Sequence, residues 1–586
     1  MAALKPFQKQ KILLHCVGRF KELREELTQL LIVEGGKPKL AAAAEVERLI
    51  NTFQIAADAV STMSNGHLMP LAVTAAASAY RGMVQHVPIG AISLISPFNF
   101  PLNLTAHKIA PAIAAGCPFV LKPASLTPIS ALKIAEILAE TDLPKGAFSV
   151  LPCPREHADV LVTDDRFKLL SFTGSDQVGW DMKARAGRKK VTLELGGNAA
   201  VLIEPDTELN DALFDRVISG AYSHAGQVCI SVQRILVHAD IYTEFKKKLV
   251  AKLKKIRAAD PSLETTIVGP MIKASEALRL KKWLDKAEKK GTKILLGGAL
   301  SGVLFEPTLL ENVDESLEIY QNEAFGPVAI LEKYKNFEKG IEIINTSRFG
   351  LQAGIYTQNL NKMLYAWDHL EVGGVIINDI PTFRVDNMPY GGVKDSGLGR
   401  EGIQFAIRDM QEERLLAEKL VNDARSQIWK TLYYDPSYTQ LKYPMGDVPL
   451  VKGVCTDVVI RALRHQNIDL QKLIHEDMQR NFKKYPQKWG LKSTDKNIDH
   501  RRVPNIMTYF QRQGYQVNDQ KYQAGDIVTW DLGKGLTHIG IISDKTTLLS
   551  KTPLVIHNIG YGTRENDILL SYKIIGHYRL PKNSSP

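Results

Sequence analysis

The sequence predicts an α/β protein in which parallel sheets organise the first two-thirds of the chain and a separate α+β domain forms the last third. Short apolar strands alternate with helical segments from about residue 91 to residue 172, the pattern of a parallel sheet covered on both faces. The 586 residues exceed what one core accommodates, so about two to four domains are expected. A basic segment begins near residue 418, with about 25 Lys and Arg against about 16 Asp and Glu.

The chain before residue 96 is predicted to be mostly helical. Apolar side chains recur at helical spacing across residues 7–34 and stop at Gly35-Gly36, so one helix is expected there and a second across about 40–60. Residues 81–96 are rich in Val and Ile, which predicts extended chain. The elements that follow are a helix ending at Gly116, a strand at 119–122, a helix at 128–140, a strand at 148–151, a helix at 156–162 and a strand at 168–172. Pockets in such sheets lie at the carboxyl ends of the strands.

Composition excludes several classes of protein. Hydrophobic content of 45% and charged content of 23% are typical of a folded globular chain. The cysteines are odd in number, scattered and without metal-ligand spacing, which favours a reducing compartment over a disulfide framework and predicts no metal site. We expect a cytoplasmic protein, because no window has the length of a membrane span and the first 20 residues lack a signal-peptide core. No nucleic-acid-binding motif is present, so no nucleic-acid partner is expected.

The segment Gly226-Gln-Val-Cys229-Ile-Ser231 is the centre of the first two-thirds of the chain. It follows a predicted helix from Asp211 to His224, and Gly226 allows a sharp turn and a close approach. A cysteine just past such a turn is placed to ionise and to attack an electrophile. An isolated cysteine between Val and Ile is more often a small buried apolar side chain, so its neighbours decide between the two interpretations.

Two predicted strands end in residues suited to a nucleotide. Lys122 ends one strand, is held by Pro123 and is placed to donate to ribose hydroxyls. Gly174 and Ser175 lie where another strand turns into a helix, and helix N-termini bind phosphate oxygens well. This turn lacks the G-x-G-x-x-G pattern, so by itself it is a weak signal.

Two further positions suit acid–base chemistry and oxyanion binding. Glu194 ends an apolar strand just before Gly196-Gly197, where partial desolvation would raise the pKa of its carboxyl towards that of a general base. A structural ion pair with Lys189 or Lys190 is an equal alternative. Asn99 lies in the rigid run Pro97-Phe-Asn-Phe-Pro101, as an oxyanion donor requires.

The motifs PFNFP, KPAS, FTGS, LELGG, GQVC, EAFGPV and PYGGVKDSGLGREG occur in this order. This set resembles the aldehyde dehydrogenase superfamily over about residues 1–417. The resemblance implies a Rossmann-like coenzyme domain at 1–204, an α/β catalytic domain at 205–405 and an oligomerisation strand at 406–417. That strand, within Glu412 to Ala417, is the one such enzymes lend to a neighbouring subunit, so a homodimer or homotetramer is expected.

By that resemblance the chain oxidises an aldehyde to a carboxylic acid with NAD or NADP. Cys229 forms the thiohemiacetal, Asn99 and the Cys229 backbone N–H hold the oxyanion, and Glu194 activates the water that hydrolyses the thioester. The coenzyme contacts it implies are Lys122 and Ser125 at the adenosine ribose, Gly174 and Ser175 at the pyrophosphate, and Glu323 and Phe325 near the nicotinamide ribose.

The chain departs from the usual pattern at Ser125 and ahead of its first helix, and its segment 379–386 indicates a class of substrate. Ser125 stands where NAD-preferring members often carry a glutamate, which removes a charge that would repel a 2′-phosphate. The segment 379–386 resembles that of enzymes acting on small aldehydes of the lactaldehyde type, and Arg384 within it serves either an anionic substrate or a structural ion pair. Members of the family usually carry strands ahead of the first helix found here, so a supporting hairpin is expected to be lacking.

The last third of the chain carries a second cysteine–histidine set. Cys455 begins a predicted helix, whereas His538 and His557 lie on later strands, as in papain-like cysteine hydrolases. The motifs GVCTDVVIRA, GDIVTWDL, GLTHIGIISD and VIHNIG resemble a bacterial envelope family of unknown function allied to NlpC-type cell-wall peptidases. The resemblance implies an α+β papain-like domain at 418–586 with Cys455 as nucleophile, His538 as base and His557 as orienting residue.

Three interpretations of this second domain stay open. It is a basic NlpC-like domain carried by a dehydrogenase, a cell-wall hydrolase for which the first part is an oligomerising scaffold, or a non-catalytic binding module. Its positive charge favours an anionic cell-wall polymer as partner. Relatives of this domain are normally exported, so the sequence predicts either an unusual fusion or two joined reading frames.

Overall fold

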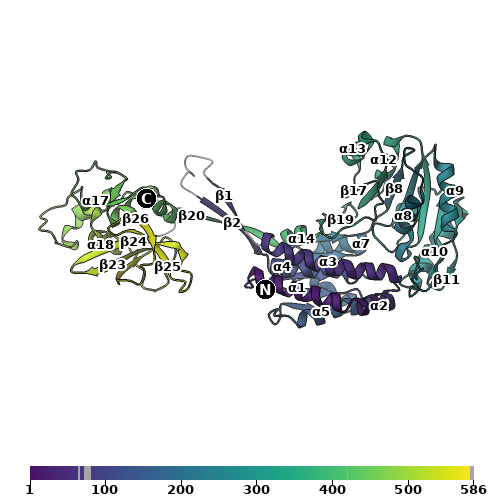
Figure 1. Ribbon diagram of the computed structural model, residues 1–586, viewed down its shortest axis with the longest axis horizontal. Coiled ribbons are helices and arrows are strands. Elements are labelled where there is room, and N and C mark those ends of the chain that lie inside the picture. Colours follow the sequence, from purple (N-terminus) through teal and green to yellow (C-terminus); the bar gives the residue numbers. More distant parts are fainter. Residues whose placement is uncertain (64–65, 72–80, 419, 467, 581–586) are drawn as a thin grey trace. The chain divides into compact units, whose positions relative to one another are not determined.

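The computed structural model describes residues 1–63, 66–71, 81–418, 420–466 and 468–580. The chain divides into two compact units, Met1–Asn65 with His86–Arg414 and Gly66–Gln85 with Leu415–Pro586. The break near residue 415 lies close to the expected boundary at residue 417. The two units are described separately below, with the element labels of Figure 1.

The first unit begins with packed helices, α1 (Pro6–Glu22), α2 (Arg24–Gly35) and α3 (Lys39–Met63), which lie side by side in Figure 1. The single helix predicted across 7–34 was wrong, because the chain breaks at Leu23, which caps both α1 and α2. The apolar spacing continues through Leu23, so the sequence pattern gave no sign of this break. Gly36 ends α2 in the left-handed conformation with φ 61°, as its position predicted.

One sheet of this unit has the strand order β19-β7-β6-β3-β4-β5. All neighbouring strands are parallel except β19 and β7, and the bounds are β3 (Ile92–Ile95), β4 (Phe119–Lys122), β5 (Phe148–Val150), β6 (Leu169–Thr173), β7 (Lys190–Glu194) and β19 (Gly397–Leu398). The helices around it are α4 (Asn103–Ala115), α5 (Pro128–Ala139), η2 (Arg155–Ala158), α6 (Asp159–Thr163), α7 (Asp176–Arg185) and α14 (Ile403–Asp409). Buried apolar clusters lie on both faces, which confirms the predicted covered parallel sheet.

A second sheet has the order β10-β13-β14-β9-β8-β16-β17. Its strands are β8 (Ala199–Ile203), β9 (Val232–His238), β10 (Lys293–Leu296), β13 (Thr308–Glu311), β14 (Val328–Tyr334), β16 (Gln352–Tyr356) and β17 (Gly374–Ile377). One face packs on α8 (Asp211–Tyr222), α9 (Tyr242–Leu253) and α10 (Ala274–Lys289), and the other on α12 (Phe337–Asn345) and α13 (Leu360–His369). Strand β8 belongs here rather than to the coenzyme domain expected to end at residue 204, whereas β19 returns to the first sheet.

Shorter elements complete the unit and its edge. These are η3 (Ser223–Gly226), β11 (Leu300–Ser301), β12 (Leu304–Phe305), α11 (Glu318–Gln321), β15 (Phe349–Gly350) and β18 (Val393–Lys394). A separate sheet has the order β1-β2-β20, with β1 (His67–Pro70), β2 (Arg81–Pro88) and β20 (Gln411–Glu418). Strand β20 contains the strand predicted at 412–417, and it exposes Leu415 and Leu416.

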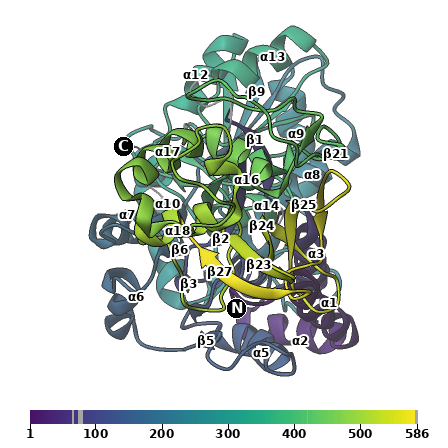
Figure 2. The ribbon, with the colours of Figure 1, turned by 90° about the vertical axis from the view of Figure 1, so that its left-hand side faces the viewer.

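The second unit is built on an antiparallel sheet of order β26-β25-β24-β23-β27 (Figure 2). The strands are β23 (Ile527–Gly533), β24 (Leu536–Thr546), β25 (Pro553–Asn558), β26 (Thr563–Asn566) and β27 (Lys573–Tyr578). One face packs on α15 (Leu420–Arg425), α16 (Cys455–Arg464), α17 (Leu470–Asn481) and α18 (Val503–Arg512), while the other forms a smaller cluster around Trp530. The short elements are β21 (Tyr433–Tyr434), β22 (Lys452–Gly453), η4 (Phe482–Lys484) and η5 (Asp499–Arg501). The helix predicted at 418–430 ends early, at Arg425, and Trp429 is left-handed with φ 66°.

Candidate active site

Cys229 lies in a strained turn between α8 and β9. Helix α8 ends at Tyr222, two residues earlier than predicted, because His224 and Ala225 are left-handed at φ 52° and 54°. Gly226 follows at φ 65°, and a Cβ atom there would lie 2.2 Å from the carbonyl oxygen of Gly326. Only glycine fits this position, as the sequence predicted. Left-handed conformations of other residues cost free energy and cluster at functional sites.

Two cavities meet at the Cys229 side chain. A cavity of about 690 Å³ is also lined by Asn99, Gly174, Glu194 and Glu323. A cavity of about 370 Å³ approaches from the other side, and its wall includes Arg384 and Tyr390. The sulfur is therefore accessible to one reactant from each side.

Asn99 lies in the loop between β3 and α4 and is 4% exposed. Its side-chain nitrogen donates a hydrogen bond to the carbonyl oxygen of Gln227 at 2.9 Å, which fixes the amide beside the turn that carries Cys229. Glu45 holds the same loop, because its carboxylate accepts hydrogen bonds from the backbone N–H groups of Leu102 at 2.9 Å and Asn103 at 3.1 Å.

Glu194 is a buried carboxyl group facing the larger cavity. Both of its carboxylate oxygens are buried without a hydrogen-bond partner among the described residues. The alternative ion pair is not formed, because Lys190 pairs with Glu412 and Lys189 donates to the carbonyl oxygen of Ala186. Burial first, and then the nearby charge of Glu401, raise the pKa of Glu194 well above its ordinary value.

Gly197 brings the strand of Glu194 against the Cys229 turn. A Cβ atom on Gly197 would lie 2.2 Å from the carbonyl oxygen of Cys229, so any other residue would force the two segments apart. This close approach explains why two glycines follow Glu194 in the sequence.

Glu401 organises the charges behind Glu194. It accepts hydrogen bonds from Lys108 at 3.3 Å and from Arg384 at 2.9 Å. Although burial alone would raise it, these two cations hold the pKa of Glu401 at about 2. A carboxylate whose pKa is lowered therefore lies close to one whose pKa is raised.

The sequence did not indicate the role of Tyr390, and it indicated Arg384 without its place beside Tyr390. The hydroxyl oxygen of Tyr390 lies 2.9 Å from the sulfur of Cys229, and the guanidinium carbon of Arg384 lies 3.6 Å from the centre of the Tyr390 ring. Burial raises the pKa of Cys229 to about 12, and Tyr390 and Arg384 oppose that rise. Tyr390 was part of a quoted motif, but nothing local to it indicated contact with the thiol.

The residues predicted to hold a coenzyme line a continuous region. Lys122 and Ser125 line a cavity of about 290 Å³, which shares Ile95, Phe172 and Ser175 with the larger cavity at Cys229. Ser175 is the N-cap of α7 but makes no capping bond with its own side chain, so the first N–H groups of that helix are available to an anion.

The nicotinamide end of this region is equally well defined. Glu323 accepts a hydrogen bond from the backbone N–H of Gly197 at 2.9 Å, and burial raises the pKa of its carboxyl to about 8. The Phe325 ring packs edge-on against Phe98 at 5.8 Å between centroids, and both line the larger cavity. Donors for phosphate at one end and a buried carboxyl at the other fit a dinucleotide.

The second unit brings His538 and His557 of the predicted set together, while the described contacts of Cys455 are with other residues. Cys455 is 5% exposed and contacts the backbone N–H of Ile539 and the hydroxyl of Tyr434, and burial raises its pKa to about 12. Nitrogens of His538 and His557 lie 3.0 Å apart, and neither histidine is among the described partners of Cys455.

The alternation of β24 accounts for this arrangement. His538 pairs in register with Trp530 and lies against its ring, so it belongs to the face of the small cluster. Its neighbour Ile539 belongs to the opposite face, where Cys455 packs at the start of α16. Burial, and then the nearby His557, lower the pKa of His538 to about 3, which disfavours the imidazolium of the predicted pair.

The fold and the site define a dehydrogenase of the thiol type, and the comparisons agree. Residues 1–415 match the Aldehyde dehydrogenase family, and the chain belongs to that family. It oxidises an aldehyde to a carboxylic acid with NAD or NADP. Residues 421–580 match a separate Domain of unknown function, DUF1287, which confirms the predicted fusion. The likeness of this domain to NlpC-type peptidases stays a prediction.

Named relatives act on small polar aldehydes. The chain is 40% identical to a 3-sulfolactaldehyde dehydrogenase of Priestia aryabhattai over 416 residues, 71% of this chain and 87% of that protein. It is 38% identical to a lactaldehyde dehydrogenase of Methanococcus aeolicus, covering 70% of this chain and 88% of that protein.

Solved structures show the same likeness. Aldehyde dehydrogenase 21 of Physcomitrella patens, in complex with its reaction product succinate, is 47% identical with a TM-score of 0.70, covering 71% of this chain and 87% of that one. Glyceraldehyde-3-phosphate dehydrogenase of Methanocaldococcus jannaschii, complexed with NADP, is 38% identical with a TM-score of 0.68, covering 71% and 91%. Within the described ranges, every helix is too short or too polar to cross a membrane.

Proposed function

We propose that the first unit catalyses NADP-linked oxidation of a small anionic aldehyde, with Cys229 as nucleophile. The thiolate attacks the aldehyde carbon, and the resulting oxyanion faces the Asn99 amide and the Cys229 backbone N–H. A coenzyme held by Lys122, Ser175 and Glu323 would supply the acceptor for the hydride that leaves that carbon. Glu194 then takes a proton from the water that hydrolyses the thioester, which releases the acid and restores the thiol.

The meeting of two cavities at Cys229 carries this proposal. The larger one holds Glu194, whose buried oxygens have no partner among the described residues and are free to accept a proton. The smaller one admits a substrate from the other side. A water molecule that enters through the larger cavity, on the coenzyme side, would therefore reach both the thioester carbon and its base, Glu194.

Charge at the adenosine end favours NADP. Lys122, Ser125 and Arg155 line the cavity of about 290 Å³, and no acid stands at Ser125 to repel a 2′-phosphate. The lining acids Asp159 and Asp181 are both paired with Arg185. Arg155 is thus placed to pair with an added phosphate. The likeness to an NADP-complexed structure supports the same preference.

The smaller cavity favours an aldehyde that carries a carboxylate or sulfonate. Arg48, Arg216 and Arg384 line it. Arg48 pairs with Asp386 and Arg216 with Asp379, while Glu45, the acid among the described lining residues, pairs with Lys37. Arg384 forms the structural ion pair with Glu401, yet its Nε atom is buried without a hydrogen-bond partner among the described residues. An anionic or hydroxyl oxygen of the substrate would satisfy that donor. Relatives named for sulfolactaldehyde and lactaldehyde fit this chemistry.

The test is a panel of short aldehydes of matched length, one with a carboxylate, one with a sulfonate and one neutral. Each is assayed with NAD and with NADP by the absorbance of the reduced nicotinamide. We expect kcat/KM for an anionic aldehyde to exceed that for the neutral one by about 10- to 100-fold, and NADP to be preferred over NAD. Equal kcat/KM across the panel would contradict the anionic substrate, and Arg155→Gln should lower the preference for NADP.

Assembly and location are inferred from the sheet β1-β2-β20 and from the cysteines. The sheet β1-β2-β20 exposes Met69, Met83, Leu415 and Leu416, and an exposed apolar sheet is suited to pairing with a second copy. A homodimer or homotetramer is therefore expected, and light scattering of the purified chain tests it. The five unpaired cysteines suit the reducing cytoplasm.

A further inference from the structure

Tyr390 is held rigidly against the reactive sulfur. Its side chain is 2% exposed and packs in a small cluster with Ile230 and Leu351. Its backbone exchanges two hydrogen bonds with Glu401, at 3.1 Å and 2.6 Å. The guanidinium of Arg384 covers one face of its ring at 3.6 Å. The hydroxyl oxygen, 2.9 Å from the sulfur, therefore has little freedom to move away.

A fixed hydroxyl discriminates between the two protonation states of a thiol. A neutral thiol is a weak acceptor, whereas a thiolate accepts a charge-assisted hydrogen bond that is about twice as strong as a neutral one. Burial disfavours the thiolate at Cys229. The Tyr390 hydroxyl offsets part of that cost only in the charged state, so it favours the form that attacks the aldehyde.

Arg384, stacked on the Tyr390 ring, strengthens the hydrogen bond that the Tyr390 hydroxyl donates to the thiolate. A cation stacked on an aromatic face is stabilised by it and draws electron density from the ring, which makes the phenol O–H a better donor. Glu401 fixes the guanidinium in place at 2.9 Å. Glu401, Arg384 and Tyr390 therefore contact one another in succession, from an ionised carboxylate to the Cys229 sulfur.

The geometry points to Tyr390 as a catalytic residue that donates a hydrogen bond to the Cys229 thiolate, with Arg384 as the residue that positions and polarises it. This inference rests on the proposed role of Cys229 as nucleophile. The thiol proton leaves to water in the adjoining cavity as the thiolate forms. Once the sulfur is bonded to the substrate carbon it accepts hydrogen bonds poorly, and the hydroxyl, still in place, can donate instead to an acceptor in the substrate cavity that it lines.

Tyr390→Phe is the direct test, because it removes the hydroxyl and keeps the ring under Arg384. The rate of alkylation of Cys229 by iodoacetamide is measured against pH on the full chain without coenzyme, with mass spectrometry to assign the modified residue. We expect the midpoint of that profile to rise by about one pH unit and the pre-steady-state burst of reduced coenzyme to slow about tenfold at neutral pH. The rate of thioester hydrolysis should not change.

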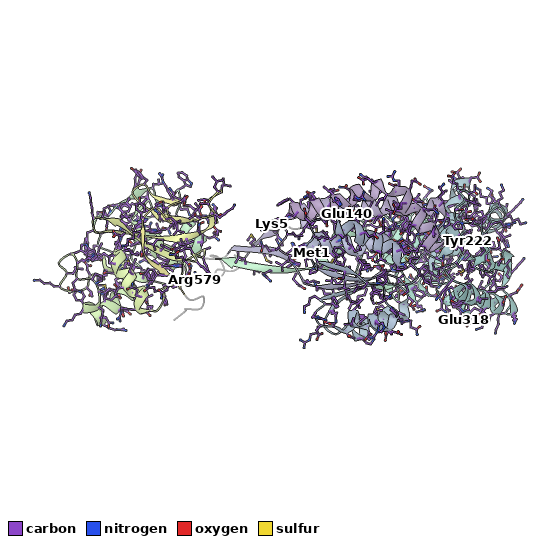
Figure 3. All side chains as sticks on the ribbon, turned by 90° about the horizontal axis from the view of Figure 1, so that it is seen from below. Met1, Lys5, Glu140, Tyr222, Glu318 and Arg579 are labelled. Atoms are coloured by element: carbon purple, nitrogen blue, oxygen red, sulfur yellow. The ribbon has the colours of Figure 1, made fainter. Side chains whose placement is uncertain are left out.

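Tyr222→Phe is the matched control. Tyr222, labelled in Figure 3, is equally buried in the same unit, and its hydroxyl donates to the carbonyl oxygen of Thr308 at 3.1 Å. Its removal should leave the alkylation profile of Cys229 unchanged. Arg384→Lys is the second variant, since it keeps the charge but loses the planar stack, and it should shift the midpoint in the same direction by a smaller amount.

The outcomes separate this inference from the proposed function. If Cys229→Ala abolishes turnover while Tyr390→Phe matches the parent in profile and burst, the role of Tyr390 is overturned and that of Cys229 stands. If Cys229→Ala retains turnover, both fail. Should Tyr390→Phe not fold, an unshifted midpoint in Arg384→Lys overturns the inference by itself.

Discussion

Cys229 and Cys455 make similar direct contacts, but they differ in whether a cavity lies beside the thiol. Burial raises the pKa of both thiols to about 12, and each is contacted by a tyrosine hydroxyl, that of Tyr390 or Tyr434. Cys229, however, lines two cavities, whereas Cys455, the first residue of α16, is packed among the apolar side chains between that helix and the sheet. A thiol at a turn beside a helix is therefore not enough for catalysis. Space for two reactants distinguishes the two sites.

The acid–base partners differ in the same way. Glu194 faces the cavity of Cys229 with both carboxylate oxygens unpaired among the described residues. Nitrogens of the two histidines of the second unit lie 3.0 Å apart, on the sheet face opposite the cluster of Cys455, and the other ring nitrogen of His557 is buried without a partner among the described residues. Glu194 is thus poised to accept a proton from water, while His538 has no thiol beside it to activate.

The largest expected effect is on turnover when each thiol is removed. Cys229→Ala should lower aldehyde oxidation by about three orders of magnitude or more, because no other group forms the covalent adduct. Cys455→Ala should leave kcat and KM within about twofold of the parent, since Cys455 contacts neither cavity. Steady-state assays of the full chain measure both, with circular dichroism as the check on folding.

Substantial turnover by Cys229→Ala would show that another group is the nucleophile. A large loss in Cys455→Ala, with the fold intact, would show that the second unit contributes to the dehydrogenase reaction.

The next effect is on hydrolysis of the thioester. Glu194→Gln should lower steady-state turnover by about 100-fold or more while leaving a burst of reduced coenzyme. Because burial and Glu401 raise the pKa of Glu194, the carboxylate forms only above the ordinary carboxyl range. Turnover of the parent should therefore rise with pH through that higher range, and Glu194→Gln should lose this dependence. A burst that disappears together with turnover would instead place Glu194 before hydride transfer.

The sequence predicted those parts of the site that lie at strand ends. Lys122, Gly174 and Glu194 follow β4, β6 and β7, and parallel strands bring their carboxyl ends to one edge of the sheet. Each residue also stood beside a proline or a glycine that marked the turn. Cys229 was recognisable for the same reason, through Gly226.

Strand ends did not predict the positions of Arg384, Tyr390 and Glu401. They reach the site because β19 pairs with β7, about 200 residues earlier in the chain, and no local pattern specifies that pairing. The arrangement at Cys455 depends on a different feature. The motif suggested that Cys455 and His538 meet, but strand alternation turns His538 away and Ile539 towards the helix, and the sequence did not reveal which face α16 covers.

A smaller effect is expected on the accessibility of the two thiols. In the native chain iodoacetamide should modify Cys229 at least about tenfold faster than Cys455, because Cys229 opens onto cavities and Cys455 is 5% exposed. In denaturant the two rates should converge. Peptide mapping by mass spectrometry measures both residues in one sample. Faster modification of Cys455 at mildly acidic pH would restore the hydrolase prediction for the second unit.

The smallest effect is on stability. Here the two variants should change places: the variant that keeps its activity loses stability, and the variant that loses its activity keeps its stability. Cys455 acts as a small apolar side chain in a core, so Cys455→Ala should lower the free energy of unfolding of its unit by about 1 kcal/mol, or about 2–4 °C in Tm. Cys229 is exposed to cavities in a strained turn, so Cys229→Ala should leave the Tm of its unit unchanged or slightly raised. Calorimetry of the full chain resolves the two transitions, since added NADP should shift only that of the first unit. If Cys229→Ala is the more destabilised variant and Cys455→Ala is neutral, Cys229 is the thiol that supports a core and the contrast between the two sites is reversed.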